Sequence, residues 1–197
     1  MMGKTHQAAA VTVVLLSAPH ISQVVMPSFP VSSTLVLVGS AMLGALLPDG
    51  DTPKSKLGRK LFFLFFPYYL LQWFVKVLSL FIPRLKKVSK VIGHRGIAHD
   101  PCLWLAFSLP FFLYCIVREE RSWLFVLIGL MIGVISHLFL DYLSGGIPVY
   151  LFKKGRLKAP VFIETGSGLE MIIFFILIVV NVLLIKEMYL KGGVLLV

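Results

Sequence analysis

Charged residues are scarce in this sequence, and they divide unevenly between the two signs. Asp, Glu, Lys and Arg make up 14% of the 197 residues, with 19 basic against 9 acidic side chains, whereas 58% of the residues are hydrophobic. A soluble domain carries about 25% charged residues. This shortage excludes an ordinary soluble domain and predicts an integral membrane protein. The length allows a single domain over residues 1–197, built from about five or six helices of roughly 20 residues each.

Cysteine is also nearly absent. The two cysteines, Cys102 and Cys115, stand near opposite ends of one apolar run, and a helix would separate them by about 20 Å. They cannot pair within that helix, so no disulfide framework is expected. The first apolar run is not followed by a clear small-residue cleavage site, so we expect no removable signal peptide.

Long hydrophobic runs are abundant, and basic islands separate them. The runs lie at residues 7–26, 31–47, 61–82, 101–117, 123–140 and 171–190. The basic islands are Lys54, Lys56, Arg59 and Lys60; then Arg84, Lys86, Lys87, Lys90 and Arg95; then Lys153, Lys154, Arg156 and Lys158. Because Lys and Arg accumulate on the cytoplasmic side of membrane proteins, we expect all three islands in the cytoplasm.

The run at 61–82 separates the first two islands, so it cannot be a single crossing if both islands are cytoplasmic. It contains Pro67, Gln72 and Lys76 and is rich in aromatic residues, which is typical of an interfacial or re-entrant segment. We therefore predict an all-α integral membrane protein with about five transmembrane helices and one interfacial or re-entrant helical segment at 61–82. Its N-terminus would be cytoplasmic and its C-terminus outside.

Side chains that can bind a metal ion occur at the ends of these runs, and this topology places them all at the cytoplasmic ends. They are His6, Asp49, Asp51, His94, His99, His137 and Asp141. Ionisable groups beside bilayer-length apolar runs are costly to keep, so they indicate a functional site. The mixture of imidazole and carboxylate favours one or two divalent transition-metal ions, zinc before manganese, over calcium or magnesium.

Each motif also has a simpler structural interpretation. His137 and Asp141 are four residues apart and share one face of a helix, but a hydrogen-bonded pair at a helix end has the same spacing. Asp49 and Asp51 also fit an ordinary helix-ending turn. GHRGIAHD is more specific, because its two histidines with Arg95 beside the first are hard to explain by packing; a solvated basic loop is the alternative. Asp100, which ends this motif, is expected to cap the next helix.

Five elements in this order resemble a known family: THQ at 5–7, LLPDGD at 46–51, GHRGIAHD at 93–100, GVISHLFLDYLSGGIPVYLF at 133–152 and ETGSGLE at 164–170. They look like the YdjM-type inner-membrane proteins, which are predicted membrane-bound metal-dependent hydrolases, and the resemblance covers most of the chain. That family is remotely similar to the zinc-dependent phospholipase C and P1 nuclease fold, an all-helical bundle with clustered zinc ions. His137 and Asp141 form a His-x-x-x-Asp pair similar to the helix-borne ligands of that fold. This chain lacks a second pair, of the His-x-x-x-Glu type, so one or two ions are expected rather than three.

The resemblance implies hydrolysis, and the basic membrane edge favours a phosphoester or phospholipid-like substrate. In this hypothesis Asp51 accepts a proton from water, and Arg95 stabilises charge on a phosphoryl oxygen. Glu164 and Glu170 flank the turn TGSG and could orient a ligand histidine, although Glu170 equally fits an acidic residue at a helix N-terminus. Anionic membrane lipids are expected partners, and nucleic acid is not.

Two other classes of protein stay open. A transporter could use the same residues, but it would be expected to bury some of them in the middle of a span. A non-catalytic membrane protein could use the metal as a structural link between helix ends. A closed shell of four protein ligands would favour that structural site, and an open coordination position would favour an enzyme.

Overall fold

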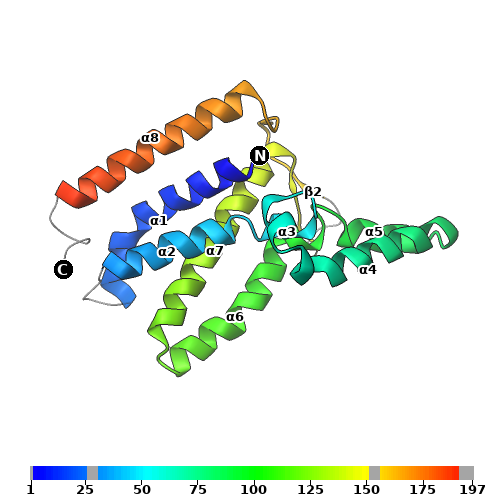
Figure 1. The fold of residues 1–197 in the computed structure, drawn as a ribbon, viewed down its shortest axis with the longest axis horizontal. Helices are drawn as coiled ribbons and strands as arrows, with labels where there is room; N and C mark the ends of the chain where they lie inside the picture. The colour runs from blue at the N-terminus through cyan, green and yellow to red at the C-terminus, as the bar shows by residue number, and fades with distance from the viewer. Residues whose placement is uncertain (1, 26–30, 151–155, 191–197) are drawn as a thin grey trace.

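The computed structural model describes residues 2–25, 31–150 and 156–190, and most of these residues are helical (Figure 1). Five helices pack side by side as a bundle. They are α1 (Gly3–Val25), α2 (Val31–Gly44), α6 (Pro101–Val117), α7 (Arg121–Ser144) and α8 (Gly168–Leu190). The all-α architecture predicted from the sequence is confirmed. Lys153 and Lys154 of the third basic island lie outside the described residues.

Shorter elements connect these helices. Between α2 and α6 the chain forms α3 (Lys56–Lys60), α4 (Phe62–Phe81), α5 (Leu85–Ile92) and two single-turn 3-10 helices, η1 (Pro48–Asp51) and η2 (Ile97–His99). After α7, β1 (Ile147–Pro148) and β2 (Arg156–Leu157) pair antiparallel, with Ile147 opposite Leu157. The helix after GHRGIAHD begins as predicted, because the Asp100 carboxylate accepts a hydrogen bond of 2.8 Å from the backbone N–H of Cys102 and so caps α6.

Many large apolar side chains of the bundle face outward, which is typical of helices surrounded by lipid. On α8, for example, Phe175, Val179 and Leu183 are all more than half exposed. Among the described residues, four stretches are long and apolar enough to cross a membrane: 33–51, 62–81, 121–144 and 168–188. The apolar helix α6 is shorter. The protein is therefore an all-α membrane protein, while the count of five spans and the interfacial position of 61–82 stay predictions.

Close contact between α2 and α7 forms the centre of the bundle. A Cβ atom added at Gly133 would stand 2.1 Å from the carbonyl oxygen of Ala41, and one added at Gly44 would stand 2.1 Å from that of Leu130. Small residues let two helices approach until their backbones touch, which is the usual basis of helix packing in membranes. The sequence GLMIG at 129–133 carries this spacing. The contact fixes the end of α7 against the turn that follows α2.

The α4–α5 pair projects from the end of the bundle (Figure 1), and polar side chains of α4 attach it to the turns there. The Tyr69 hydroxyl donates to the carbonyl of Gly50 (2.9 Å). The Gln72 amide donates to the carbonyl of Asp51 (3.0 Å) and to that of Ile92 (2.7 Å). Gln72, which makes 61–82 unusual as a membrane span, therefore supports the η1 turn and the segment before His94.

Candidate metal centre

The predicted ligands meet at one end of the bundle, although they come from five separate segments of the chain. His6 lies in the first turns of α1, Asp49 and Asp51 in η1, His94 after α5, His99 in η2, and His137 and Asp141 at the end of α7. Helix α7 ends at Ser144, three residues after Asp141, and the chain turns away there with Gly146 at a positive φ of 84°, a conformation that favours glycine. Figure 1 shows the start of α1, the end of α7 and the segment around β2 close together.

Two groups of side chains have the spacing of metal ligands. His6, His137 and Asp141 form one group, and Asp49, His99 and His137 form the other; in each group one donor atom per residue lies within 4.8 Å of the others. The rings of His6 and His137 stack with their centroids 3.9 Å apart. All of these residues except Asp49 are buried. Because both groups include His137, the arrangement is compatible with one ion or with two neighbouring ions.

The backbone fixes the orientation of His137. Its Nδ1 lies 2.7 Å from the carbonyl oxygen of Ala45, and a carbonyl can only accept a hydrogen bond. In the neutral ring, Nδ1 therefore carries the hydrogen, and Nε2 presents its lone pair to the carboxylates of Asp141 (3.5 Å) and Asp49 (3.8 Å). Histidines that bind metals are typically oriented in this way by a second hydrogen bond.

His99 sits between three carboxylates. Its Nε2 is 3.3 Å from Asp141 and 3.6 Å from Asp49, and its Nδ1 is 3.5 Å from Asp51. Burial alone would lower the pKa of His99, but the three carboxylates outweigh burial and raise this pKa to about 10. Without an ion, the carboxylates thus draw a proton onto His99. A divalent cation would supply the same positive charge more effectively.

The donor set fits a divalent transition metal. Both ring nitrogens of His99 and Nε2 of His137 are buried and make no hydrogen bond of good geometry among the described residues. Buried polar atoms usually have such a partner, and imidazole with carboxylate is a common zinc-binding set. The residues that could hold an ion are therefore His6, Asp49, His99, His137 and Asp141.

His94 and Asp51 belong to neither of these groups and instead pair with each other. His94 Nδ1 lies 2.8 Å from Asp51 Oδ1, and the other carboxylate oxygen accepts a hydrogen bond of 3.1 Å from the backbone N–H of Arg95. The Asp51 side chain is fully buried, whereas 49% of the His94 side chain is exposed. The pair therefore extends from the buried cluster to the surface.

Arg95 lies beside the cluster in a strained backbone conformation. Its φ is +57°, which is uncommon for a residue other than glycine and often marks a functional site. Its Nη2 is 3.6 Å from the Asp141 carboxylate. A Cβ atom at position 145 would stand 2.6 Å from Nη1, so Gly145 leaves the space that the guanidinium occupies. The side chain is 24% exposed, so one side remains accessible to a ligand.

The two predicted supporting glutamates have different environments. The buried carboxylate of Glu170 accepts hydrogen bonds from the Thr5 hydroxyl (2.9 Å), the Met2 backbone N–H and the Gly166 backbone N–H (2.7 Å). Through these bonds Glu170 anchors the start of α1, next to His6. None of the three bonds is made to a ligand histidine. Glu164 is exposed, and its described hydrogen bond is made by its backbone carbonyl. The Ala45 carbonyl and Thr5 were not anticipated from the sequence.

Comparison with known proteins identifies the family. The chain matches the YdjM inner membrane protein family over residues 1–194. It is 31% identical over 140 residues to "Uncharacterized protein YvsG" of Bacillus subtilis, covering 71% of each chain. It is also 31% identical over 151 residues to "Inner membrane protein YdjM" of Escherichia coli, covering 74% of this chain and 65% of that protein.

The chain thus spans just under two thirds of the Escherichia coli relative. No solved structure matches it significantly, and the remote similarity to the phospholipase C and P1 nuclease fold is not shown by these matches. The family match covers nearly the whole sequence, and the helical bundle is that of a membrane protein. The chain therefore belongs to the YdjM family of inner membrane proteins.

Proposed function

We propose that this protein is a membrane-bound metal-dependent hydrolase that acts on a phosphoester or phospholipid-like substrate. The observation that carries this proposal is the continuity between a buried His and Asp cluster and the accessible side chains of His94 and Arg95. A purely structural metal site needs only the buried part. In a structural site Arg95 would balance part of the Asp141 charge, but as a cation beside the ligands it would also oppose metal binding.

One or two divalent ions, zinc by preference, would be held by His6, Asp49, His99, His137 and Asp141. Such an ion acts as a Lewis acid toward an ester oxygen and makes water a stronger acid. Zinc is preferred because of the donor types: three imidazoles with two carboxylates suit zinc better than magnesium or calcium.

The His94–Asp51 pair is suited to accept the proton of the attacking water. Both carboxylate oxygens of Asp51 already accept hydrogen bonds, from His94 and from the backbone of Arg95. Asp51 would therefore act through His94, by holding Nδ1 and fixing the orientation of the ring, as a carboxylate does for a catalytic histidine. This arrangement refines the initial hypothesis, in which Asp51 accepted the proton directly.

Arg95 would stabilise negative charge on a phosphoryl group. Its guanidinium lies next to Asp141 at the edge of the cluster and is partly exposed, and its bidentate fork matches phosphate oxygens. The backbone hydrogen bond from Arg95 to Asp51 couples the position of this side chain to the His94–Asp51 pair.

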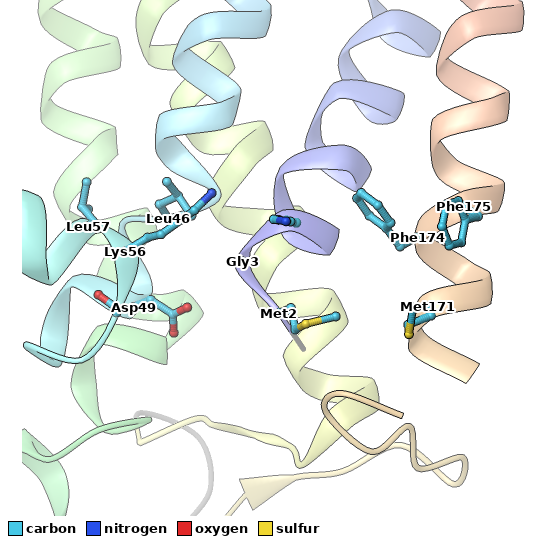
Figure 2. Close-up of a pocket in the computed structure, with 11 residues that line it drawn as sticks. Met2, Gly3, Leu46, Asp49, Lys56, Leu57, Met171, Phe174 and Phe175 are labelled. Carbon is cyan, nitrogen blue, oxygen red and sulfur yellow. The ribbon is translucent and has the colours of Figure 1, made fainter. Parts of the chain in front are cut away.

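Apolar grooves beside the cluster favour an amphiphilic substrate. One groove, with a volume of about 420 Å³, contains Asp49 together with Lys4 and Lys56. Figure 2 shows Asp49 on one side of this groove and the α8 side chains Met171, Phe174 and Phe175 on the other. An acyl chain could occupy the apolar part while a phosphate remained near the lysines. A second groove of about 450 Å³ reaches Asp51 between aromatic side chains.

The test is a turnover assay with the purified protein in detergent or lipid. A panel of phospholipid and phosphoester substrates is offered to the zinc-loaded protein, with chelator-treated protein as the blank. We expect metal-dependent turnover of at least one phosphoester, and Arg95→Lys should retain the metal while losing roughly tenfold or more in kcat/KM, because a point charge replaces a bidentate donor. Bound metal without turnover of any substrate in the panel would instead favour a structural metal site.

A further inference from the structure

A basic cleft opens beside the candidate metal centre, on the side of His94. It has a volume of about 630 Å³, and its basic and polar lining side chains are Lys87, Lys90, His94, Tyr150 and Arg156. No carboxylate is among the described residues that line it. His94 is shared with the candidate active site, where its Nδ1 contacts Asp51.

The described part of the chain contributes three cations to the cleft, and they come from two segments that are distant in sequence. Lys87 and Lys90 are three residues apart on α5, so they lie on the same face of that helix. Arg156 begins β2, and its Nη2 donates a hydrogen bond of 3.3 Å to the carbonyl oxygen of Arg95. This bond places the Arg156 guanidinium next to the backbone of a proposed catalytic residue.

Bringing like charges into one cleft costs free energy unless an anion neutralises them. The acidic side chains near this region are already engaged: Asp51 pairs with His94, and Asp100 accepts from the backbone N–H groups of Cys102 and Tyr150. The cleft thus retains a concentrated positive charge, together with the neutral hydroxyl of Tyr150. Such a set of donors recognises phosphate oxygens.

We infer that this cleft binds a phosphate group of the substrate that is separate from the ester bond to be hydrolysed. The inference rests on the proposed function, because it assigns the substrate class: a phosphoester that carries a second phosphate, such as a diphosphate or a phosphorylated head group. The metal ligands and Arg95 would engage the scissile ester, while Lys87, Lys90 and Arg156 would hold the second phosphate on the far side of His94.

The experiment measures phosphate binding to chelator-treated protein, so that neither metal coordination nor turnover contributes. Calorimetric titration with pyrophosphate compares the wild type with Lys87→Gln/Lys90→Gln and with Arg156→Gln. The control is Lys54→Gln/Lys60→Gln, which removes the same charge from exposed lysines outside the cleft. Both cleft variants should bind pyrophosphate about tenfold or more weakly, the loss expected for charge-assisted hydrogen bonds, and the control should stay within about twofold of the wild type.

Zinc content and melting temperature of each variant show whether it is folded. Arg156→Lys keeps the positive charge, so restored binding in this variant would show that Arg156→Gln loses affinity because it loses the charge. The source of the phosphate is distinguished with two short-chain lipids of equal length. Dihexanoyl phosphatidic acid bound more tightly than pyrophosphate, with no binding of dihexanoyl phosphatidylcholine, assigns a lipid head group. Pyrophosphate bound at least as tightly as the phosphatidic acid assigns a soluble phosphate compound.

Equal pyrophosphate affinity in Lys87→Gln/Lys90→Gln and in the control, or no measurable binding to the wild type, would overturn the inference about the cleft. Either result would leave the proposed hydrolysis intact if the zinc-loaded protein still turns over a phosphoester. Conversely, cleft-dependent phosphate binding without any metal-dependent turnover would overturn the hydrolase proposal and retain the cleft as a phosphate-binding site.

Discussion

The carbonyl oxygen of Ala45 is a decisive contact of His137, because it determines which ring nitrogen faces the carboxylates. His137 also belongs to both groups of candidate ligands. Loss of its ring would therefore remove a donor from either ion, whereas the hydrogen bond to Ala45 contributes only about 1 kcal/mol to stability. At the scale of single residues, His137 is the most informative position for a test of the metal centre.

We predict that His137→Ala remains inserted in the membrane but loses metal affinity by more than the roughly 10- to 100-fold that accompanies loss of an outer hydrogen bond to a ligand. Metal content per purified chain provides the measurement. His20→Ala serves as the matched control, since His20 is an exposed histidine of the same helix as His6 and belongs to neither group of candidate ligands. Unchanged metal content in both His137→Ala and His99→Ala would show that this cluster does not bind the ion.

At the scale of helices, the contact between α2 and α7 determines whether the ligands can meet. Helix α2 leads to Ala45 and the η1 turn, and α7 carries His137 and Asp141. The two helices approach closely because Gly133 and Gly44 have no side chain where the opposing backbone lies. A wider separation would move the Ala45 carbonyl away from His137, so packing and metal binding should fail together.

Gly133→Ala tests this coupling. The added Cβ atom would stand 2.1 Å from the carbonyl oxygen of Ala41, so the helices must move apart, and we expect destabilisation by roughly 1–3 kcal/mol together with weaker metal retention. Unfolding in denaturing detergent and metal analysis provide the two measurements. Gly39→Ala on α2 is the control, because a Cβ atom there meets nothing within 4 Å. If Gly133→Ala had the same stability and metal content as Gly39→Ala, the conclusion that α2 and α7 pack closely at Gly133 would be wrong.

At the scale of the whole molecule, the structure places the start of α1 and the start of α8 near the ligand end, since Glu170 of α8 bonds to Thr5 of α1. The far end of α8 therefore points away from the metal centre (Figure 1). If the ligand end is cytoplasmic, as the basic islands predict, the far end of α8 lies on the outer side. The α4–α5 pair would then lie at the cytoplasmic face with the metal centre.

Topology reporters test this arrangement. A reporter inserted near Lys56 or Lys87 should register as cytoplasmic, and one fused after residue 191 should register as periplasmic, because the basic residues around α3 and α5 resist translocation. The reporters near Lys56 and Lys87 should register on the same side of the membrane, since a single crossing by α4 would place them on opposite sides. Labelling at Lys87 from outside would refute the interfacial position of 61–82.

The sequence by itself determined the class of protein and the candidate ligands. Apolar composition and the length of the runs indicated a helical membrane protein, since the bilayer requires about 20 apolar residues per helix whatever the tertiary fold. Likewise, the four-residue spacing of His137 and Asp141 implied a shared helix face, and Asp100 before Pro101 indicated a cap. These inferences succeeded because they depend on residues that are neighbours in sequence.

Only the tertiary structure decided how the candidates are divided. It paired Asp51 with His94, placed Asp49 with His99 and His137, and turned Glu170 toward Thr5 rather than toward a ligand histidine. Residue types and spacing could not reveal these pairings, because they depend on distances between segments far apart in the chain. The close approach of α2 and α7 sets several of these distances, and the Ala45 contact is made by a backbone carbonyl, a group that every residue carries and no sequence pattern distinguishes.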